Sequence, residues 1–174
     1  MTTPPAPDPG PDPGPHPAID PLLPVGRHDI HQLLDVEVVE ASPQKVVLRL
    51  PVTWKVHQPY GLLHGGVSAL LAESAASFAG ALAAGPERSV VGIELNASHL
   101  RSVRHGHLTA TATPVRTGRT VQVWSIALTD DDGRDICLAR CTRAVVGGPG
   151  GATGAVVGPV VGPAVVAAEG QAPE

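Results

Sequence analysis

A single carboxylate, Glu73, interrupts the longest apolar stretch of this sequence, residues 67–84. A carboxylate buried among alanines and leucines is costly unless it is paired, so such a glutamate is a candidate catalytic group. The alternative is an exposed glutamate on a polar stripe with Ser74 and Ser77. No other charged residue occurs in this stretch, which favours a catalytic role for Glu73.

The segment just before the apolar stretch can hold an oxygen that carries negative charge. Gly65 and Gly66 precede the stretch directly, where the first N–H groups of a helix have no acceptor within the helix. Glycine also lets a ligand approach the backbone closely. The pair therefore predicts an oxyanion hole, although a glycine-rich turn entering a helix is the simpler interpretation of these two residues alone.

The spacing of Gly65 and Glu73 has a consequence for assembly. Eight residues of helix span about 12 Å at 1.5 Å per residue. An amide and a carboxylate that act on one carbonyl group must both lie within about 3–3.5 Å of its atoms. If the two residues share a substrate, Glu73 comes from a second subunit, and a two-fold dimer with two equivalent sites is predicted.

These residues need a long helix and a sheet to position them. Residues 67–84 are rich in Ala, Leu and Ser and end at Gly85-Pro86, which predicts a helix, and an all-round apolar helix is normally buried. A short helix is expected at 29–34. Strands are expected where β-branched residues lie between turn signals, at residues 35–40, 45–51, 90–100, 108–115, 121–129 and 136–146. One helix wrapped by one antiparallel sheet is an α+β architecture.

The stretch from Tyr60 to Ser74, YGLLHGGVSALLAES, resembles the hotdog-fold acyl-CoA thioesterases of the PaaI-like type. Two further blocks, VVGIELNASHLRS from Val90 and QVW from Gln122, are similar to the same family. The branch most like this chain contains the 1,4-dihydroxy-2-naphthoyl-CoA and the Glu-dependent 4-hydroxybenzoyl-CoA thioesterases. The resemblance covers about residues 45–146, and His-Gly-Gly followed at this interval by Leu-Ala-Glu is specific.

The resemblance implies a long helix wrapped by a curved antiparallel sheet of about six strands, in a homodimer that usually pairs into a homotetramer. Gly65 would polarise the thioester carbonyl, and His64 and Gln58 would help to position it. Glu73 would act as nucleophile or as general base for water. Ser77, one turn later, would hold the water or the acyl group.

Contacts with coenzyme A are assigned to several side chains. His99 resembles a family position near the mouth of the site, and Phe78 is a candidate wall of the acyl pocket or a core residue. Arginines gather between Arg88 and Arg119, which suits a phosphorylated small molecule. Arg101 and Arg119 are the candidates for the coenzyme A phosphates, with solvated surface arginines as the alternative. No metal and no cofactor are expected, because the histidines lack a ligand pattern.

The ends of the chain differ from its middle. Residues 1–18 repeat Pro-Asp-Pro-Gly units and residues 147–174 are mostly Gly, Ala, Val and Pro, so both are expected to be disordered tails around a domain at 19–146. The N-terminus has no secretion signal, and Cys137 and Cys141 cannot bond each other along one strand, which indicates the cytoplasm. Glu73 and the serines argue against a membrane span at 67–84.

The net charge of −4 and only four aromatic residues argue against a nucleic-acid partner. Hotdog hydratases remain an alternative, although His64 opens the Gly-Gly turn that thioesterases use. A non-catalytic acyl-CoA-binding domain is another alternative, but such a domain has little need of Glu73. The acyl group is expected to be aromatic, with a broad-specificity acyl-CoA or acyl-carrier-protein thioesterase as the second possibility.

Overall fold

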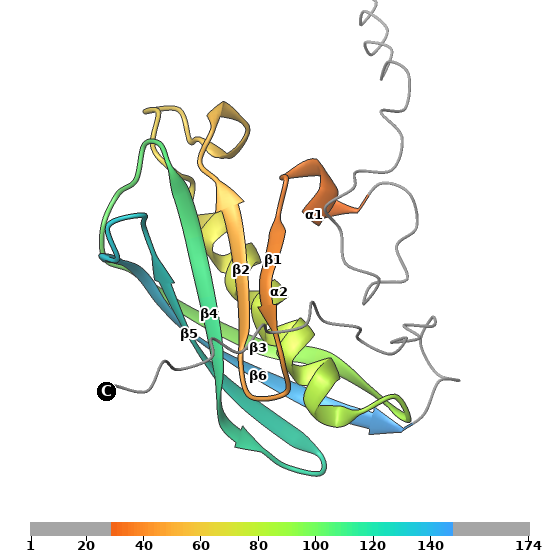
Figure 1. Cartoon of the computed structure of the whole chain (residues 1–174). Coiled ribbons are helices and arrows are strands. Elements are labelled where there is room, and N and C mark those ends of the chain that lie inside the picture. Colours follow the sequence, from red (N-terminus) through yellow and green to blue (C-terminus); the bar gives the residue numbers. More distant parts are fainter. Residues whose placement is uncertain (1–28, 148–174) are drawn as a thin grey trace, which may run out of the picture.

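A six-stranded antiparallel sheet curls around one long helix in the computed structural model, which describes residues 29–147 (Figure 1). The strand order is β1-β2-β4-β5-β6-β3, and every neighbouring pair is antiparallel. Helix α2 (Gly65–Ala84) crosses the concave face and packs against five of the six strands, β2 to β6. The predicted α+β hotdog architecture is confirmed.

The remaining elements follow the predicted order. They are α1 (Ile30–Leu33), β1 (Glu37–Ala41), β2 (Val46–Pro51), the 3₁₀ helix η1 (Trp54–Val56), β3 (Arg88–His99), β4 (His107–Thr117), β5 (Val121–Thr129) and β6 (Asp135–Gly147). Most strand boundaries differ from the predicted ones by one or two residues. The first strand was expected to include Asp35, but the φ of 55° at this residue turns the chain before β1 begins. The predicted tails lie outside the described residues, except Gly147, which ends β6.

Helix α2 lies close to the sheet because its buried face is built mainly from small residues. Ala72, Ala75, Ala76 and Ala79 recur at helical spacing and are fully buried. The helix begins two residues earlier than predicted. It ends as expected before Gly85, whose φ of 78° is left-handed and favours glycine.

Only one side of α2 is buried, so the expectation of an all-round buried helix was wrong for a single chain. The sheet is open on one side, and residues there, such as Glu73, are exposed. By length and composition α2 is the one helix among the described residues that is apolar enough to cross a membrane. Its small-residue face against five strands is the packing of a core helix.

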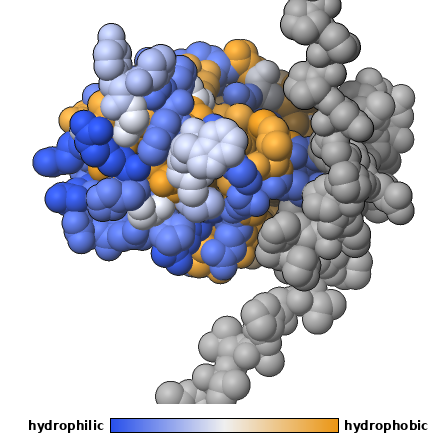
Figure 2. All heavy atoms as spheres, turned by 90° about the horizontal axis from the view of Figure 1, so that it is seen from above, coloured by the Kyte–Doolittle hydropathy of each residue, from blue (hydrophilic) through white to orange (hydrophobic). Residues whose placement is uncertain are grey.

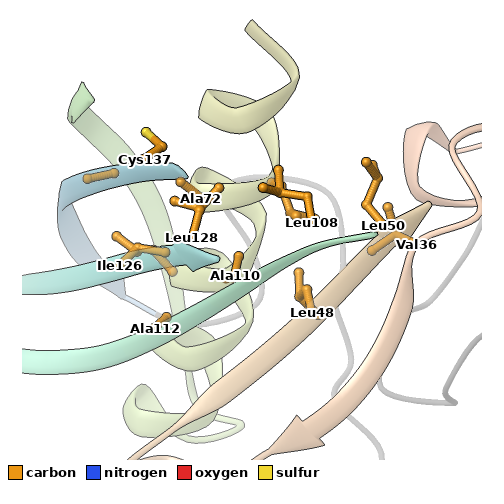
Figure 3. Packing of buried hydrophobic residues seen from close by; sticks show 14 of the residues in the cluster. Val36, Leu48, Leu50, Ala72, Leu108, Ala110, Ala112, Ile126, Leu128 and Cys137 are labelled. Carbon is orange, nitrogen blue, oxygen red and sulfur yellow. The ribbon is translucent and has the colours of Figure 1, made fainter. Parts of the chain in front are cut away.

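The core is a continuous layer between the sheet and α2. In-register rows of inward side chains form it, and one row runs through Leu48, Ala110, Leu128 and Cys137 on four adjacent strands. Each of these residues is fully buried, and Figure 3 shows Leu128 and Cys137 beside Ala72 of the helix, with Leu48 further away on β2. Cys137 and Cys141 are both buried free thiols. The packed layer between the sheet and α2 holds the start of α2 in a fixed position relative to the strand ends.

Candidate active site

The first turn of α2 carries the predicted oxyanion hole. Gly65 is the first helical residue, so its amide is among those without an acceptor inside the helix. His64 is the N-cap, and its Nδ1 accepts a hydrogen bond of 2.9 Å from the N–H of Gly66. This bond engages the N–H of Gly66, whereas the N–H of Gly65 has no acceptor among the backbone groups that the structure describes.

The loop before α2 places Gln58 against this helix start. His57 and Leu63 form an isolated bridge, and the Gln58 N–H donates to the carbonyl of Leu62 over 2.8 Å, so the loop folds back on itself. The Gln58 Oε1 accepts from the N–H of Tyr60 at 2.7 Å. With the oxygen engaged in the turn, the Gln58 Nε2 is the end of the amide that can donate to a ligand.

A cavity of about 410 Å³ opens beside Gly65 and Gln58, within the size range of small-molecule sites. Apolar residues form part of its wall, and polar residues form the rest; they are Gln58, Leu62, Leu63, Gly65, Ser68, His99, Leu100, Arg101, Ser102 and Ile136. Figure 2 shows the end of the molecule where α2 begins, and hydrophilic residues there surround smaller hydrophobic patches. Four predicted site residues, Gln58, Gly65, His99 and Arg101, thus lie around one cavity.

The absence of a side chain at Gly65 creates the space for His99. A Cβ at Gly65 would lie 2.8 Å from the His99 Nε2 and 3.1 Å from its Cε1. The ring of His99, at the end of β3, therefore packs directly against the first turn of α2. Glycine at position 65 thus leaves its backbone amide accessible and allows the end of β3 to approach α2 closely.

Glu73 does not reach this cavity in a single chain. It lies two turns further along α2, is exposed, and its carboxylate is directed at β3, where a Cβ on Gly92 would lie 2.8 Å from Glu73 Oε1. The expected burial of Glu73 was therefore wrong for one chain, because the sheet leaves this side of the helix open. The position agrees with the spacing argument that one chain does not bring Glu73 to its own Gly65.

Ser77 and Phe78 lie further along the same helix and outside the cavity. The Ser77 hydroxyl donates to the backbone carbonyl of Glu73 over 2.7 Å, so it is engaged one turn back. Phe78 is half-buried against the core, with its ring centroid 5.5 Å from that of His31 on α1. Phe78 thus packs between α1 and the core in the single chain.

The two arginines assigned to coenzyme A lie at different ends of the sheet. Arg101 follows β3, lines the cavity and is exposed. Arg119 lies in the turn between β4 and β5, at the far end of β4, where its carbonyl accepts a 2.6 Å hydrogen bond from Arg88. In one chain only Arg101 is at the cavity.

Ser68 is a cavity residue that the sequence analysis did not select. It lies three residues after Gly65, on the same face of α2, and is 2% exposed. Helical spacing from Gly65 was the signal that could have identified it.

For metals, the described residues contain no group of three or more His, Cys, Asp or Glu side chains able to hold an ion.

Comparisons with known proteins agree with this arrangement. Residues 60–137 match the family model described as Thioesterase superfamily. The chain is 46% identical over 116 residues to a 1,4-dihydroxy-2-naphthoyl-CoA hydrolase of Listeria monocytogenes, covering 67% of this chain and 94% of that protein. It is 40% identical over 114 residues to the proofreading thioesterase EntH of Cronobacter turicensis, covering 66% of this chain and 83% of EntH.

A solved structure has the same fold. The crystal structure of a thioesterase from Haemophilus influenzae superposes with a TM-score of 0.67 at 38% identity, over 69% of this chain and 84% of that one. The matches to the Listeria hydrolase and to EntH cover 94% and 83% of those proteins, so the likeness extends beyond a motif. The chain therefore belongs to the thioesterase superfamily and is a thioester hydrolase with the hotdog fold.

Proposed function

We propose that the protein hydrolyses acyl-CoA thioesters at two sites of a homodimer, each built from both subunits. Gly65 and Gln58 of one subunit hold the thioester carbonyl, and Glu73 of the other supplies the carboxylate. The observation that supports this most directly is the separation of the two parts. The cavity lies at Gly65, while Glu73 is exposed on an open side of the same helix.

The edge of the sheet next to Glu73 is suited to self-association. β3 is one of the two edge strands and pairs only with β6, so the other edge of its 12 residues is unpaired among the described residues. Val91 and Ile93 on β3 are large apolar side chains that are 42% and 59% exposed. We place the two-fold axis here, with β3 beside β3 and α2 beside α2, and such dimers can pair again into a tetramer.

The chemistry needs only groups of the protein and water. In one route the Glu73 carboxylate attacks the carbonyl carbon, the coenzyme A thiolate leaves, and water hydrolyses the acyl anhydride. In the other, Glu73 takes a proton from water as the oxygen adds to the carbonyl, and the thiolate then leaves and is protonated. Both routes place negative charge on the carbonyl oxygen, which the Gly65 amide stabilises. No metal or cofactor takes part.

The acyl group is proposed to be aromatic. The Listeria relative is named for a dihydroxynaphthoyl thioester, and four apolar side chains line the cavity, namely Leu62, Leu63, Leu100 and Ile136. The second candidate is a broader acyl-CoA or acyl-carrier-protein thioesterase, because the relative EntH is named for proofreading and not for one acyl group. The free buried thiols suit a reducing compartment, so we place the reaction in the cytoplasm.

A thiol-release assay with the full chain tests the function. We expect hydrolysis of benzoyl-CoA and 4-hydroxybenzoyl-CoA with a higher kcat/KM than that of hexanoyl-CoA or palmitoyl-CoA. Equal kcat/KM values across the panel would favour the broad-specificity candidate. Binding of every thioester without thiol release would favour the non-catalytic alternative, and hydration of crotonoyl-CoA without thiol release would favour a hydratase.

Replacing Gly65 with alanine is expected to lower kcat/KM for benzoyl-CoA about tenfold, because misplacing reacting groups slightly has large effects on rate. The new Cβ would lie 2.8 Å from the His99 ring, which must turn and change the wall of the cavity. Gly147→Ala is the matched control, since a Cβ there meets nothing within 4 Å. An unchanged kcat/KM in Gly65→Ala would contradict the proposed place of the thioester.

Replacing Arg101 with alanine is expected to raise KM for benzoyl-CoA about fivefold to tenfold, with little change in kcat, because an exposed charge contact with phosphate contributes modestly. The KM for S-benzoyl pantetheine, which lacks the nucleotide, should stay the same. Arg116→Ala, a change of another arginine, on β4, is the control. Equal increases in KM for both thioesters would show that Arg101 does not hold the nucleotide phosphates.

A further inference from the structure

Arg143 is a buried arginine on the face of the sheet that packs against α2. It is 5% exposed and lies in register between Gln122 on β5 and Gly92 on β3. A guanidinium stays charged in proteins, and burial of a charge is costly without a partner of opposite charge. A residue of this kind in the interior of a small domain therefore requires an explanation.

The hydrogen bonds of Arg143 do not neutralise its charge. Its Nη2 donates to the carbonyl of Val90 over 3.5 Å and its Nη1 to the Cys141 Sγ over 3.9 Å, both long contacts to uncharged acceptors. Its Nε is buried and has no partner among the described residues. Among the described residues, no carboxylate lies within 4 Å of the guanidinium. The positive charge of Arg143 therefore has no close negative partner.

Two glycines provide the space in which the Arg143 side chain lies. A Cβ on Gly80 of α2 would lie 3.3 Å from Arg143 Cδ, so the stem passes directly under the helix. A Cβ on Gly92 of β3 would lie 3.8 Å from Arg143 Nη1 and 2.8 Å from Glu73 Oε1. The guanidinium of Arg143 and the carboxylate of Glu73 therefore both border the space left by Gly92.

Among the ionisable groups near this space, Glu73 is the one that can balance the positive charge of Arg143. Burial raises the pKa of the Cys141 thiol, an effect that Arg143 partly opposes, so Cys141 stays neutral at pH 7. Glu94, on the other face of β3, accepts a 3.2 Å hydrogen bond from Thr142 and lies 3.9 Å from Arg140. Glu73 is the carboxylate that lies against the inner face of β3, at Gly92.

We propose that Arg143 is a positioning residue that holds the carboxylate of Glu73 over Gly92 for reaction. The inference rests on the proposed catalytic role of Glu73. An exposed glutamate on a helix samples several rotamers, and attraction to a fixed cation favours one of them. Covering this side of α2 with a second subunit would exclude water and strengthen the attraction. Arg143 itself touches neither the thioester nor the water.

The test measures thiol release from benzoyl-CoA by Arg143→Gln and Arg143→Lys, each in the wild-type and the Glu73→Gln background. We expect Arg143→Gln to lower kcat about tenfold with KM within twofold, and Arg143→Lys to recover part of that loss, because lysine supplies a positive charge but is shorter than arginine and lacks its planar group. In the Glu73→Gln background, Arg143→Gln should cause no further loss. Arg140→Gln, on the outer face of the same strand, is the control for altered charge.

Gly92→Ala provides a second test if Arg143→Gln does not form a folded dimer. The new Cβ displaces the Glu73 carboxylate from the space beside Arg143 and leaves Arg143 in place, so kcat should again fall with KM unchanged. Wild-type kcat in either variant, or an equal loss from Arg143→Gln in both backgrounds, overturns the positioning role. Full activity of Glu73→Gln alone would instead reject the proposed catalytic role of Glu73.

Discussion

Glu73→Ala is expected to lower the rate of thiol release from benzoyl-CoA about 10³-fold, while the protein keeps its fold and its assembly. The reason for the loss is chemical: the proposed reaction has no other carboxylate to attack the carbonyl or to take a proton from water. The reason for the retained fold is structural. Glu73 is exposed on one chain, and alanine is the best helix former, so α2 loses no core contact.

Two measurements make this result specific. Size-exclusion chromatography and far-UV circular dichroism should give the same values for Glu73→Ala and wild type. Glu40→Ala is the matched control, because Glu40 is a half-exposed glutamate on β1 whose carboxylate pairs with Lys45 at 2.8 Å, away from the cavity. If Glu73→Ala turned over benzoyl-CoA at a near-normal rate, the assigned mechanism would be rejected, whatever the fold of the variant.

The central helix was predictable because local and global signals agree along it. Its alanines allow close packing on the sheet, and Gly85-Pro86 ends it at the position that the sequence indicates. Its start was predicted two residues too late, because the Gly65-Gly66 pair disfavours helix by propensity. The hydrogen bond from Gly66 to His64 Nδ1 stabilises that first turn, and a side-chain cap of this kind is not evident from propensity.

The strands were predictable as elements, but their neighbours were not. Alternating residues identify β5, which occupies the expected residues 121–129. Nothing local indicates that β3 pairs with β6, which is separated from it by two strands in the chain. That pairing brings His99 and Ile136 to one cavity and places Arg143 opposite Gly92, so the wall of the site depends on contacts distant in sequence.

The candidate site was predictable where its groups are local to one motif. Gln58, His64 and Gly65 lie within eight consecutive residues, and the structure places them around the start of α2. The error concerned the environment of Glu73, since composition predicted burial and the single chain leaves it exposed. Whether Glu73 is buried depends on what covers the open side of the helix. The local sequence around Glu73 does not indicate what that covering surface is.

The proposed site, shared between two subunits, makes a prediction that a site within one chain does not. A dimer of one Glu73→Ala subunit and one Gly65→Pro subunit should recover about half of the wild-type rate, because one of its two sites combines an intact Gly65 with an intact Glu73. Gly65→Pro removes the donor amide at the first helical position, where helices accept proline. His64 already has φ −72° and ψ 127°, a conformation that a residue before proline adopts readily.

The two subunits would be co-expressed with different affinity tags, purified over both resins and collected as dimers by size-exclusion chromatography. Each variant alone should be nearly inactive toward benzoyl-CoA, so the recovered rate arises only from the mixed species. If both groups acted within one chain, every site in the mixed dimer would lack one of them and no activity would return. Recovery would therefore assign Glu73 and Gly65 to different subunits, which neither single variant can do, since both lose activity under either arrangement.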